Sequence, residues 1–280
     1  MTDLIRIESG RYRVYLKSEK YDIERLIMGL KDTPVSVKKG RLGIKILHLD
    51  SIKIACRQYA HGGMLRRFTG DMFFSAKRAI REMEILSYLA SSGIPAVEPV
   101  CVIEEKNCFF KKLYLLTVFE EKTENLLEFL AHADKRTRLR MAKKVALLFW
   151  MLESVGIYHP DLHLDNILVG IDASRSNRNF VRQGAYLGQH DLLLIDFDRA
   201  ERKIITARDI ERMLWRLNRY TEKMERNGRL KLDADEKTLF LRTYERVTGR
   251  SVLESMRTEL RRKQLLSRIG WVVESVFYRT

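Results

Sequence analysis

Three polar residues of the 280-residue sequence have the types and spacing that phosphoryl transfer requires. Asp161 lies five residues before Asn166 in a short polar segment, and Asp196 follows an apolar run further along the chain. An aspartate beside an attacking hydroxyl can accept its proton, so Asp161 is the candidate catalytic base. Asn166 and Asp196 offer the oxygen ligands that Mg²⁺ prefers and are the candidate metal ligands. The set predicts a kinase that uses ATP and Mg²⁺.

Each of these residues also has a simpler structural explanation. A loop aspartate such as Asp161 often caps a turn, and Asn166 and Asp196 stand at the expected ends of strands. The coincidence of all three in a helix–loop–strand context favours the catalytic interpretation. His159 is interpreted as a structural residue of the loop. His163 and Asp165 either shape the loop or touch the substrate, and a solvated loop is the alternative explanation.

A phosphate-binding cation is expected on a strand in the first third of the chain, with an acidic residue on a following helix to hold it. Arg57 and Glu82 fit these positions best, and Lys53 is the alternative cation. Arginine binds phosphate through a planar fork, unlike the point charge of lysine; an ordinary surface ion pair is the simpler explanation. Gly40 and Gly43 frame a segment whose backbone can approach phosphates, although two glycines equally describe a plain turn.

The elements that must position these residues follow from hydrophobic periodicity and from turn residues. Helices are expected at residues 21–30, 75–90 and 135–155 and over most of the chain after residue 207, and strands at residues 11–16, 43–49, 51–59, 113–119, 166–169 and 192–196. The catalytic loop therefore connects a long helix to a short strand. An unusually long connector, residues 170–190, separates that strand from the next one.

The order of elements, strand-rich and then helix-rich, predicts an α+β protein with two lobes. A polar connector at residues 120–123 is the best boundary. We therefore expect an N-lobe over residues 1–119 that grips the ATP phosphates, and a C-lobe over residues 120–280 with the catalytic loop, the metal site and a basic helical tail. The expected fold is two-lobed and protein-kinase-like, with a cleft between the lobes.

Composition restricts the setting in which the protein works. Three cysteines, too few and too irregularly spaced for a metal site, suggest a reducing compartment. The N-terminus lacks the apolar core of a signal peptide, and every apolar run is too short to span a bilayer. These features predict a cytoplasmic protein, either soluble or attached peripherally to a membrane.

The formal net charge of +15 favours an anionic partner. Part of this surplus lies in residues 201–280, where Arg and Lys flank the apolar positions of two expected helices, at residues 210–217 and 253–260. Such helices either lie on an anionic membrane surface or pack their apolar face against the lobe. An aromatic content of 9% without a base-stacking motif argues against nucleic acid.

The same residues carry a family resemblance. The segment from Asp161 to Asn166 and the segment Ile195-Asp196-Phe197-Asp198-Arg199 resemble the bacterial lipopolysaccharide-core sugar kinases. Within that group they are most similar to the 3-deoxy-D-manno-octulosonic acid (Kdo) kinases, with the heptose kinases as close relatives. The Arg57 strand with the Gly-Gly pair that follows it, and the helix that carries Glu82, also resemble this family.

The resemblance implies a protein-kinase-like fold and the ATP-dependent phosphorylation of a Kdo hydroxyl on a lipid A precursor. It also implies peripheral association with the anionic cytoplasmic face of the inner membrane, and no obligate protein partner is inferred. The sequence departs from the family at Ala60-His61, where a basic pair is usual, and in the length of its connector at residues 170–190. Asp198 stands where protein kinases have glycine, which argues against a regulated protein kinase.

Three other functions stay open at this point. The first is a heptose kinase of the same pathway. The second is a small-molecule phosphotransferase of the aminoglycoside or choline type, which shares a similar catalytic loop. The third is a non-catalytic kinase-like scaffold, against which the joint presence of Asp161, Asn166 and Asp196 argues.

Overall fold

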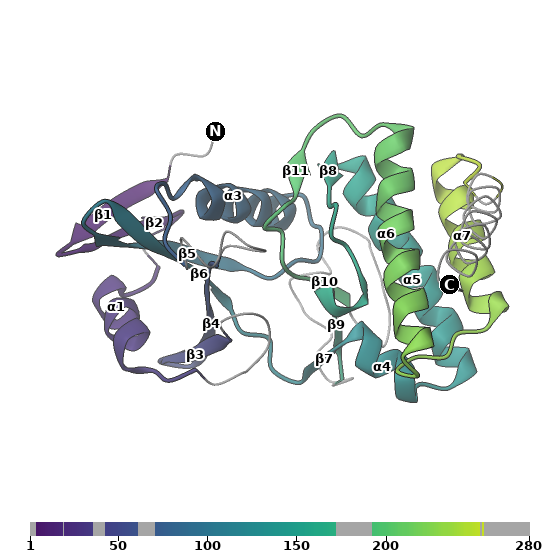
Figure 1. Ribbon diagram of the computed structural model, residues 1–280, viewed down its shortest axis with the longest axis horizontal. Helices are drawn as coiled ribbons and strands as arrows, with labels where there is room; N and C mark the ends of the chain where they lie inside the picture. Colours follow the sequence, from purple (N-terminus) through teal and green to yellow (C-terminus); the bar gives the residue numbers. More distant parts are fainter. Residues whose placement is uncertain are drawn as a thin grey trace, which may run out of the picture. The chain divides into compact units, whose positions relative to one another are not determined.

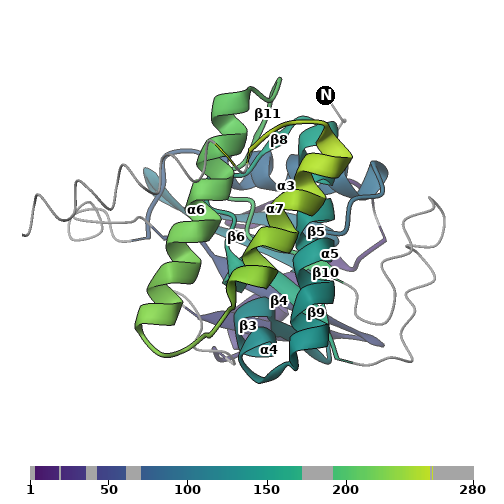
Figure 2. The same ribbon diagram turned by 90° about the vertical axis from the view of Figure 1, so that its right-hand side faces the viewer.

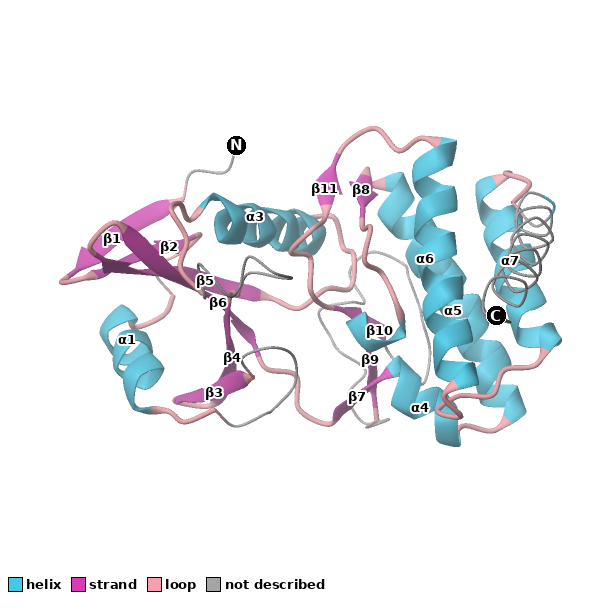
Figure 3. Cartoon of the chain, in the orientation of Figure 1, coloured by secondary structure: helices cyan, strands magenta, loops and turns pink. Residues whose placement is uncertain are grey.

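The computed structural model describes residues 4–18, 20–35, 43–60, 71–171, 192–252 and 254. Several sequence predictions lie outside these residues: Gly40, the Gly62-Gly63 turn, most of the connector at residues 170–190, and the second basic helix around residues 253–260. The described elements follow the predicted order: strands dominate the first part of the chain and helices dominate the last part (Figure 3).

The chain forms two compact units, and each combines two separate segments. The first unit contains Met1–Asn125 and Asn166–Arg202, and the second contains Leu126–Asp165 and Lys203–Thr280. The sequence placed the boundary between residues 119 and 120 and assigned everything beyond it to the helical lobe. The difference has a physical cause, because the strand that follows Asn166 pairs with strand β7 (Thr123–Asn125) and so joins the first unit.

A six-stranded antiparallel sheet forms the centre of the first unit (Figure 1). Its spatial order is β1 (Ile5–Ser9), β2 (Tyr12–Leu16), β5 (Pro99–Asn107), β6 (Phe110–Val118), β4 (Ile52–Gln58) and β3 (Ile44–Leu49). The strands predicted at residues 43–49 and 51–59 are confirmed and form the hairpin of β3 and β4, whose register places Ile44 opposite Arg57. Asp50 makes the turn with a φ of 52°, a left-handed conformation that aspartate tolerates.

Helix α1 (Ile23–Asp32) forms a core with one face of this sheet. It begins at Asp22, whose side chain accepts a hydrogen bond from the backbone N–H of Arg25 at 3.2 Å. Its apolar stripe of Leu26, Ile27 and Leu30 is buried with alternate residues of the strands. The alternating burial of β2 shows the period-two pattern expected of a strand with one face in a core.

Helix α3 (Lys77–Ser91) contacts strands β5 and β6 of the same sheet. It matches the helix predicted at residues 75–90 and buries Met83, Leu86 and Leu89. Glu82 is buried with these apolar residues, at only 2% exposure. A buried carboxylate is costly unless it is paired and hydrogen-bonded, so the burial of Glu82 indicates a polar cluster at this point of the helix.

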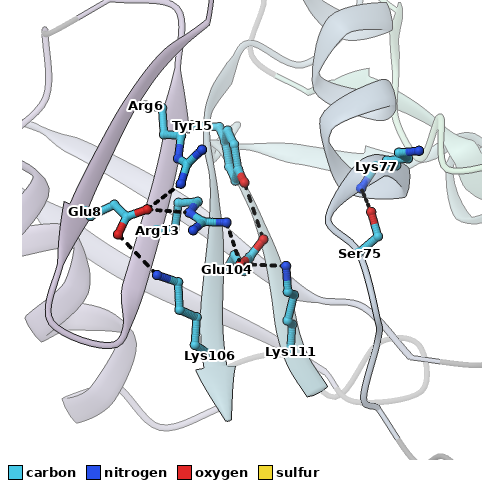
Figure 4. A network of polar contacts seen from close by, with 9 residues as sticks. All are labelled: Arg6, Glu8, Arg13, Tyr15, Ser75, Lys77, Glu104, Lys106 and Lys111. Atoms are coloured by element: carbon cyan, nitrogen blue, oxygen red, sulfur yellow. Dashed lines mark hydrogen bonds and ion pairs between the residues drawn. The ribbon is translucent and has the colours of Figure 1, made fainter. Parts of the chain in front are cut away.

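A polar network covers part of the strands β1, β2, β5 and β6 (Figure 4). Glu104, 1% exposed, accepts hydrogen bonds from Arg13 and Tyr15 and pairs with Lys111 at 3.0 Å. Nearby, the exposed Glu8 pairs with Arg6, Arg13 and Lys106. These contacts join neighbouring strands, and Glu8 and Glu104 compensate the two lysines that lie directly opposite each other, Lys106 and Lys111, so the network is structural.

A second, three-stranded sheet positions the Asp196 segment within the first unit. Its order is β10 (Leu192–Leu194), β9 (Ile167–Gly170) and β7, all antiparallel. Leu194 also contacts the segment that follows α3: the backbone N–H of Val97 donates a hydrogen bond to the Leu194 carbonyl oxygen at 3.1 Å. The end of β10 is thereby held from two sides, which fixes the residues that follow it.

The second unit is helical, and α5, α6 and α7 pack side by side in both views (Figures 1 and 2). Its helices are α4 (Leu126–His132), α5 (Lys135–Ser154), α6 (Ala207–Arg226) and α7 (Ala234–Thr248). This unit also contains β8 (Ile157–Tyr158) and most of the short helical turn η2 (Leu164–Asn166), whereas β11 (Glu201–Arg202) ends the second segment of the first unit. Helix α5 ends at Ser154, close to the predicted end at residue 155, and Gly156 follows its cap; the φ of 70° at Gly156 suits glycine, and a Cβ there would lie 2.8 Å from the Lys203 carbonyl oxygen.

The apolar face of α6 packs inside the helical unit. Ile210, Met213, Leu214 and Leu217 are all buried, with Leu217 the most exposed at 8%. Of the two arrangements considered for this basic amphipathic helix, the structure has the packed one, so this face does not lie on a membrane. Within the described ranges, no helix has the length and hydropathy needed to cross a bilayer.

Candidate active site

Asp196 follows β10 in a left-handed conformation. Its φ is 64°, which is uncommon for a residue other than glycine and is tolerated best by Asn and Asp. The preceding residue, Ile195, donates its backbone N–H to the carbonyl oxygen of Asn166 at 3.0 Å. The next residue, Phe197, is completely buried, so the backbone at Asp196 is held on both sides. The two predicted metal ligands therefore belong to segments joined by a backbone hydrogen bond.

Arg57 joins the two carboxylates that the sequence assigned to different tasks. Its Nη2 donates to Glu82 at 2.6 Å from Oε1 and 2.5 Å from Oε2, and its Nη1 donates to Oδ1 of Asp196 at 2.5 Å. Burial works against the charge of Arg57, but Glu82 and the neighbouring acidic groups raise its pKa well above the ordinary value. The Arg57 side chain is 30% exposed and its guanidinium stays charged, so it can bind an anion.

Glu82 is the centre of this cluster. Burial raises the pKa of its carboxyl above the ordinary value, and the charge of Arg57 opposes that shift. Tyr59 donates its hydroxyl to Oε2, and the backbone N–H of Phe197 donates to Oε1 at 3.0 Å. Three donors thus satisfy a buried carboxylate, and Glu82 fixes both the cation on β4 and the backbone beside Asp196.

A second ion pair, which sequence reasoning missed, lies in the same unit. Arg78 of α3 binds Asp198 through two nitrogens, with Nε and Nη2 on separate carboxylate oxygens. Its guanidinium also lies 5.5 Å from the centre of the Tyr59 ring. Arg78 stands four residues before Glu82, on the same side of the helix, and this spacing was the available signal.

The other residues predicted for the phosphate site are placed as follows. Lys53, the alternative cation, forms an ion pair with Glu121 and is 40% exposed. Gly43 immediately precedes β3 with a φ of 73°, a left-handed turn conformation that favours glycine. Gly40 lies outside the described residues. The structure thus brings together Arg57, Glu82 and Asp196 and leaves Lys53 in a separate pair.

Asp161 lies in the helical unit, on a loop anchored by buried neighbours. His159 and Leu162 are both 0% exposed, and the backbone N–H of Leu162 donates to the His159 carbonyl at 3.3 Å. The Asp161 side chain, 38% exposed, pairs with Arg216 of α6. Nε and Nη2 of Arg216 lie 2.8 Å and 2.5 Å from the same oxygen, Oδ1. No sequence signal pointed to Arg216 beyond its place in a basic helix.

Tyr220, one turn after Arg216 on α6, holds the next part of the loop. Its ring stacks on His163, with centroids 4.3 Å apart and planes 8° from parallel. Its hydroxyl donates to Oδ2 of Asp165. Burial, together with the hydrogen bond to Asp165, raises the pKa of Tyr220, so the phenol stays protonated and remains a donor. Two side chains of one helix therefore position three residues of the candidate catalytic loop.

The residues available for a magnesium ion suit that ion. Asp196 supplies a carboxylate with a side chain 41% exposed, and Asn166 supplies an amide oxygen. Over residues 4–171 and 192–254, apart from the short masked stretches, no cluster of three or more His, Cys, Asp or Glu side chains could hold a metal alone. Magnesium needs no such cluster, because it usually binds one or two protein oxygens, waters and the substrate phosphates.

A strand cation held by a helix glutamate, with an aspartate after a short strand, is the arrangement of protein kinases, in which lysine takes the place of Arg57. Fold and side chains thus define the class of protein as a kinase. The profile of the lipopolysaccharide kinase (Kdo/WaaP) family matches residues 27–244 of the sequence. The chain belongs to this family, and ATP is accordingly its phosphoryl donor.

Individual relatives agree with the family assignment. A 3-deoxy-D-manno-octulosonic acid kinase of Xanthomonas oryzae pv. oryzae is 28% identical over 220 residues, which cover 76% of this chain and 79% of that protein. A protein of the same name from Vibrio vulnificus is 25% identical over 165 residues, covering 57% and 61%. The solved structure of WaaP in complex with acyl carrier protein superposes with a TM-score of 0.54 at 18% identity, covering 90% of this chain and 92% of WaaP. The predicted α+β, kinase-like fold is thereby confirmed.

Proposed function

We propose that this kinase transfers the γ-phosphoryl group of ATP to a hydroxyl of the Kdo sugar of a lipid A precursor. The observation that supports this acceptor most directly is the similarity to proteins named 3-deoxy-D-manno-octulosonic acid kinase, at 28% identity over three quarters of the chain. The acceptor is thus inferred from relatives, whereas phosphoryl transfer itself follows from the family and the site.

In this proposal Asp161 is the catalytic base. Phosphoryl transfer needs mainly positioning and charge neutralisation, and one carboxylate suffices to accept the proton of the attacking hydroxyl. The packing of His159 and Leu162 and the contacts from Arg216 and Tyr220 support this role, because they hold the loop in one conformation.

Arg57 is the proposed contact to the ATP phosphates, and Glu82 orients it. Asn166 and Asp196 would hold Mg²⁺, which neutralises phosphate charge when it is bound. Arg57 already pairs with Asp196 at 2.5 Å. Phosphate oxygens compete for the guanidinium and the metal competes for the carboxylate, so both partners of this pair have a favourable alternative once the nucleotide and the metal bind.

The setting that fits this acceptor is the anionic cytoplasmic face of the inner membrane. The net charge of +15 supports attraction to such a surface. Because the apolar face of α6 is buried, this helix can contribute to attachment only through its charged residues. Flotation with liposomes of anionic lipid tests this: binding should weaken as salt is raised, and absence of binding at low salt would exclude it.

One assay tests the acceptor. The protein is incubated with ATP, Mg²⁺ and either a Kdo-containing lipid A precursor or a heptose-containing core acceptor, and the products are examined by mass spectrometry. The assay is run with and without acyl carrier protein, because WaaP was solved in complex with it. A phosphate mass added to the Kdo acceptor is expected, and it should be lost in Asp161→Ala. Transfer to the heptose acceptor alone would reject the Kdo assignment.

A further inference from the structure

The contact between Arg216 and Asp161 pairs the candidate base with a cation from a different element. Both residues belong to the helical unit. The Asp161 and Arg216 side chains are 38% and 33% exposed, so solvent, and therefore a small ligand, can reach both. Structural ion pairs stabilise a fold little when they are this exposed, so the position of Arg216 calls for another reason.

The chemistry of the proposed acceptor supplies that reason. A sugar acid carries a carboxylate, and its hydroxyl has to approach Asp161, which is itself an anion. Two carboxylates at close range repel each other unless a cation lies between them. Arg216 is already bound to one of the two, with Nε and Nη2 on Oδ1 of Asp161. A cation in that place would turn the repulsion into attraction.

The geometry of the guanidinium suits this task. Its five N–H donors exceed what one carboxylate oxygen can accept, and its planar fork binds carboxylates in two-point fashion. Lysine, as a point charge, cannot serve two carboxylates with the same directionality. Tyr220, one turn further along α6, holds Asp165 and His163 of the same loop. The helix therefore fixes the loop and the cation together.

We propose that Arg216 binds the carboxylate of the acidic sugar acceptor and thereby presents a hydroxyl of that sugar to Asp161. The inference rests on the proposed function, because it assumes an acceptor with a carboxylate. It makes Arg216 the residue that distinguishes sugar acids from neutral sugars. In the absence of the acceptor, the pair with Asp161 keeps the guanidinium in place.

The test compares two acceptors that differ only in this group: a Kdo-lipid acceptor and the same molecule with its carboxylate converted to the neutral carboxamide. KM and kcat are measured for the wild type and for Arg216→Met, Arg216→Lys and Arg226→Met. Arg226 is an exposed residue of the same helix and serves as the charge-matched control. Thermal unfolding of each variant verifies that it is folded.

The wild type and Arg226→Met should show a KM for the carboxamide roughly 10- to 100-fold above that for the acid, the range of a charge-assisted hydrogen-bonded pair. Arg216→Met should treat both acceptors alike, and Arg216→Lys should retain part of the discrimination. A residue that only orients Asp161 would instead lower kcat equally for both acceptors and leave the ratio of KM values unchanged. That result would overturn the proposal.

Binding measured without ATP separates this proposal from the assignment of the acceptor. Titration calorimetry of the Kdo monosaccharide and its carboxamide reports recognition of the carboxylate whether or not phosphate is transferred. Selective binding of the acid that is lost in Arg216→Met, without any transfer by the wild type, would reject the proposed function and support the Arg216 site. Transfer by a wild type that binds both sugars equally would reject the Arg216 site alone.

Discussion

Arg57 and Asp196, separated by 139 positions in the sequence, are joined by a hydrogen bond of 2.5 Å from Nη1 to Oδ1. The same guanidinium is held on its other side by the buried carboxylate of Glu82. The candidate phosphate-binding cation and a candidate metal ligand therefore compensate each other's charge before any nucleotide binds. This arrangement keeps both groups oriented within one compact unit, which is the pre-organisation that electrostatic catalysis requires.

Replacing Arg57 should weaken nucleotide binding and also destabilise the fold. Arg57→Met removes the cation that compensates Glu82, and breaking such a pair should cost about 2–3 kcal/mol, less than for a fully buried pair because Arg57 is partly exposed. KM for ATP should rise roughly 10-fold or more. Arg57→Lys keeps the positive charge but loses the planar fork. Its stability and its KM for ATP should therefore lie between those of the wild type and of Arg57→Met. Urea unfolding and steady-state kinetics measure both effects.

Lys53→Met is the matched control for this experiment. Lys53 lies on the same strand but pairs with Glu121 at the surface. The variant should unfold within about 0.5 kcal/mol of the wild type and keep its KM for ATP. A rise in that KM for Lys53→Met, with Arg57→Met unaffected, would transfer the phosphate contact to Lys53.

Local chemistry made part of this site predictable from the sequence. The hairpin that carries Arg57 and the helix that carries Glu82 follow from apolar periodicity, and the register of β3 and β4 depends only on a short turn. The pair between Arg78 and Asp198 was not predictable in the same way, because the two residues are 120 positions apart. The packing of α3 decides which of its arginines faces Asp198, and the sequence does not reveal that packing.

The division into compact units differs from the lobes expected from the sequence for a similar reason. The segment that begins at Asn166 follows a helical region, and its composition gives no sign that it returns to the first unit. That return depends on the pairing of β9 with β7, which lies more than 40 positions earlier in the chain. Long-range strand pairing is decided by tertiary context and is the part of a fold that local patterns describe least well.

Tyr220→Phe tests how the catalytic loop is held. The variant keeps the ring that stacks on His163 but removes the hydroxyl that donates to Asp165. Loss of a hydrogen bond to a charged group should reduce the free energy of unfolding by about 1–2 kcal/mol. We expect kcat to fall several-fold while KM for ATP stays constant, because the change lies in the loop and not in the phosphate contacts.

Tyr220→Leu provides the comparison, because it removes the stacked ring as well. It should be less stable than Tyr220→Phe by about 0.5–1.5 kcal/mol. Chemical unfolding and single-turnover kinetics measure the two variants. Equal kcat values for the wild type and both variants would show that α6 does not position the loop for catalysis.

Asp209→Asn should destabilise the protein in a pH-dependent manner. Asp209 pairs with Lys203 at 2.7 Å and completes the N-terminal cap of α6 with Thr206. The hydrogen bond from Lys203 lowers the pKa of Asp209 to about 2, with a further contribution from Thr206. Because the pKa in the folded protein lies below that of the unfolded chain, the stabilisation is present above about pH 4 and is lost as the pH falls toward 2.

The measurement is the difference in Tm between the wild type and Asp209→Asn as a function of pH. The difference should be several degrees at pH 7, since a helix cap contributes about 1 kcal/mol, and it should shrink toward pH 2. Asp235→Asn is the control, because Asp235 also lies in the first turn of a helix and pairs with a lysine but is 70% exposed. A Tm difference that stayed constant from pH 7 to pH 2 would contradict the proposed role of the ionised Asp209.

Asp196→Asn should separate the metal role of this residue from its pairing with Arg57. Asparagine keeps an oxygen that Arg57 can bind, but it lacks the charge that attracts a divalent cation. We expect the Mg²⁺ concentration at half-maximal activity to rise at least about 10-fold, with a far smaller change in folding stability than in Arg57→Met, because Glu82 still compensates the guanidinium. Activity is titrated with Mg²⁺ at a fixed ATP concentration, and thermal unfolding is followed in parallel. An unchanged Mg²⁺ requirement, with kcat also unchanged, would remove Asp196 from the metal site and leave it as a partner of Arg57 alone.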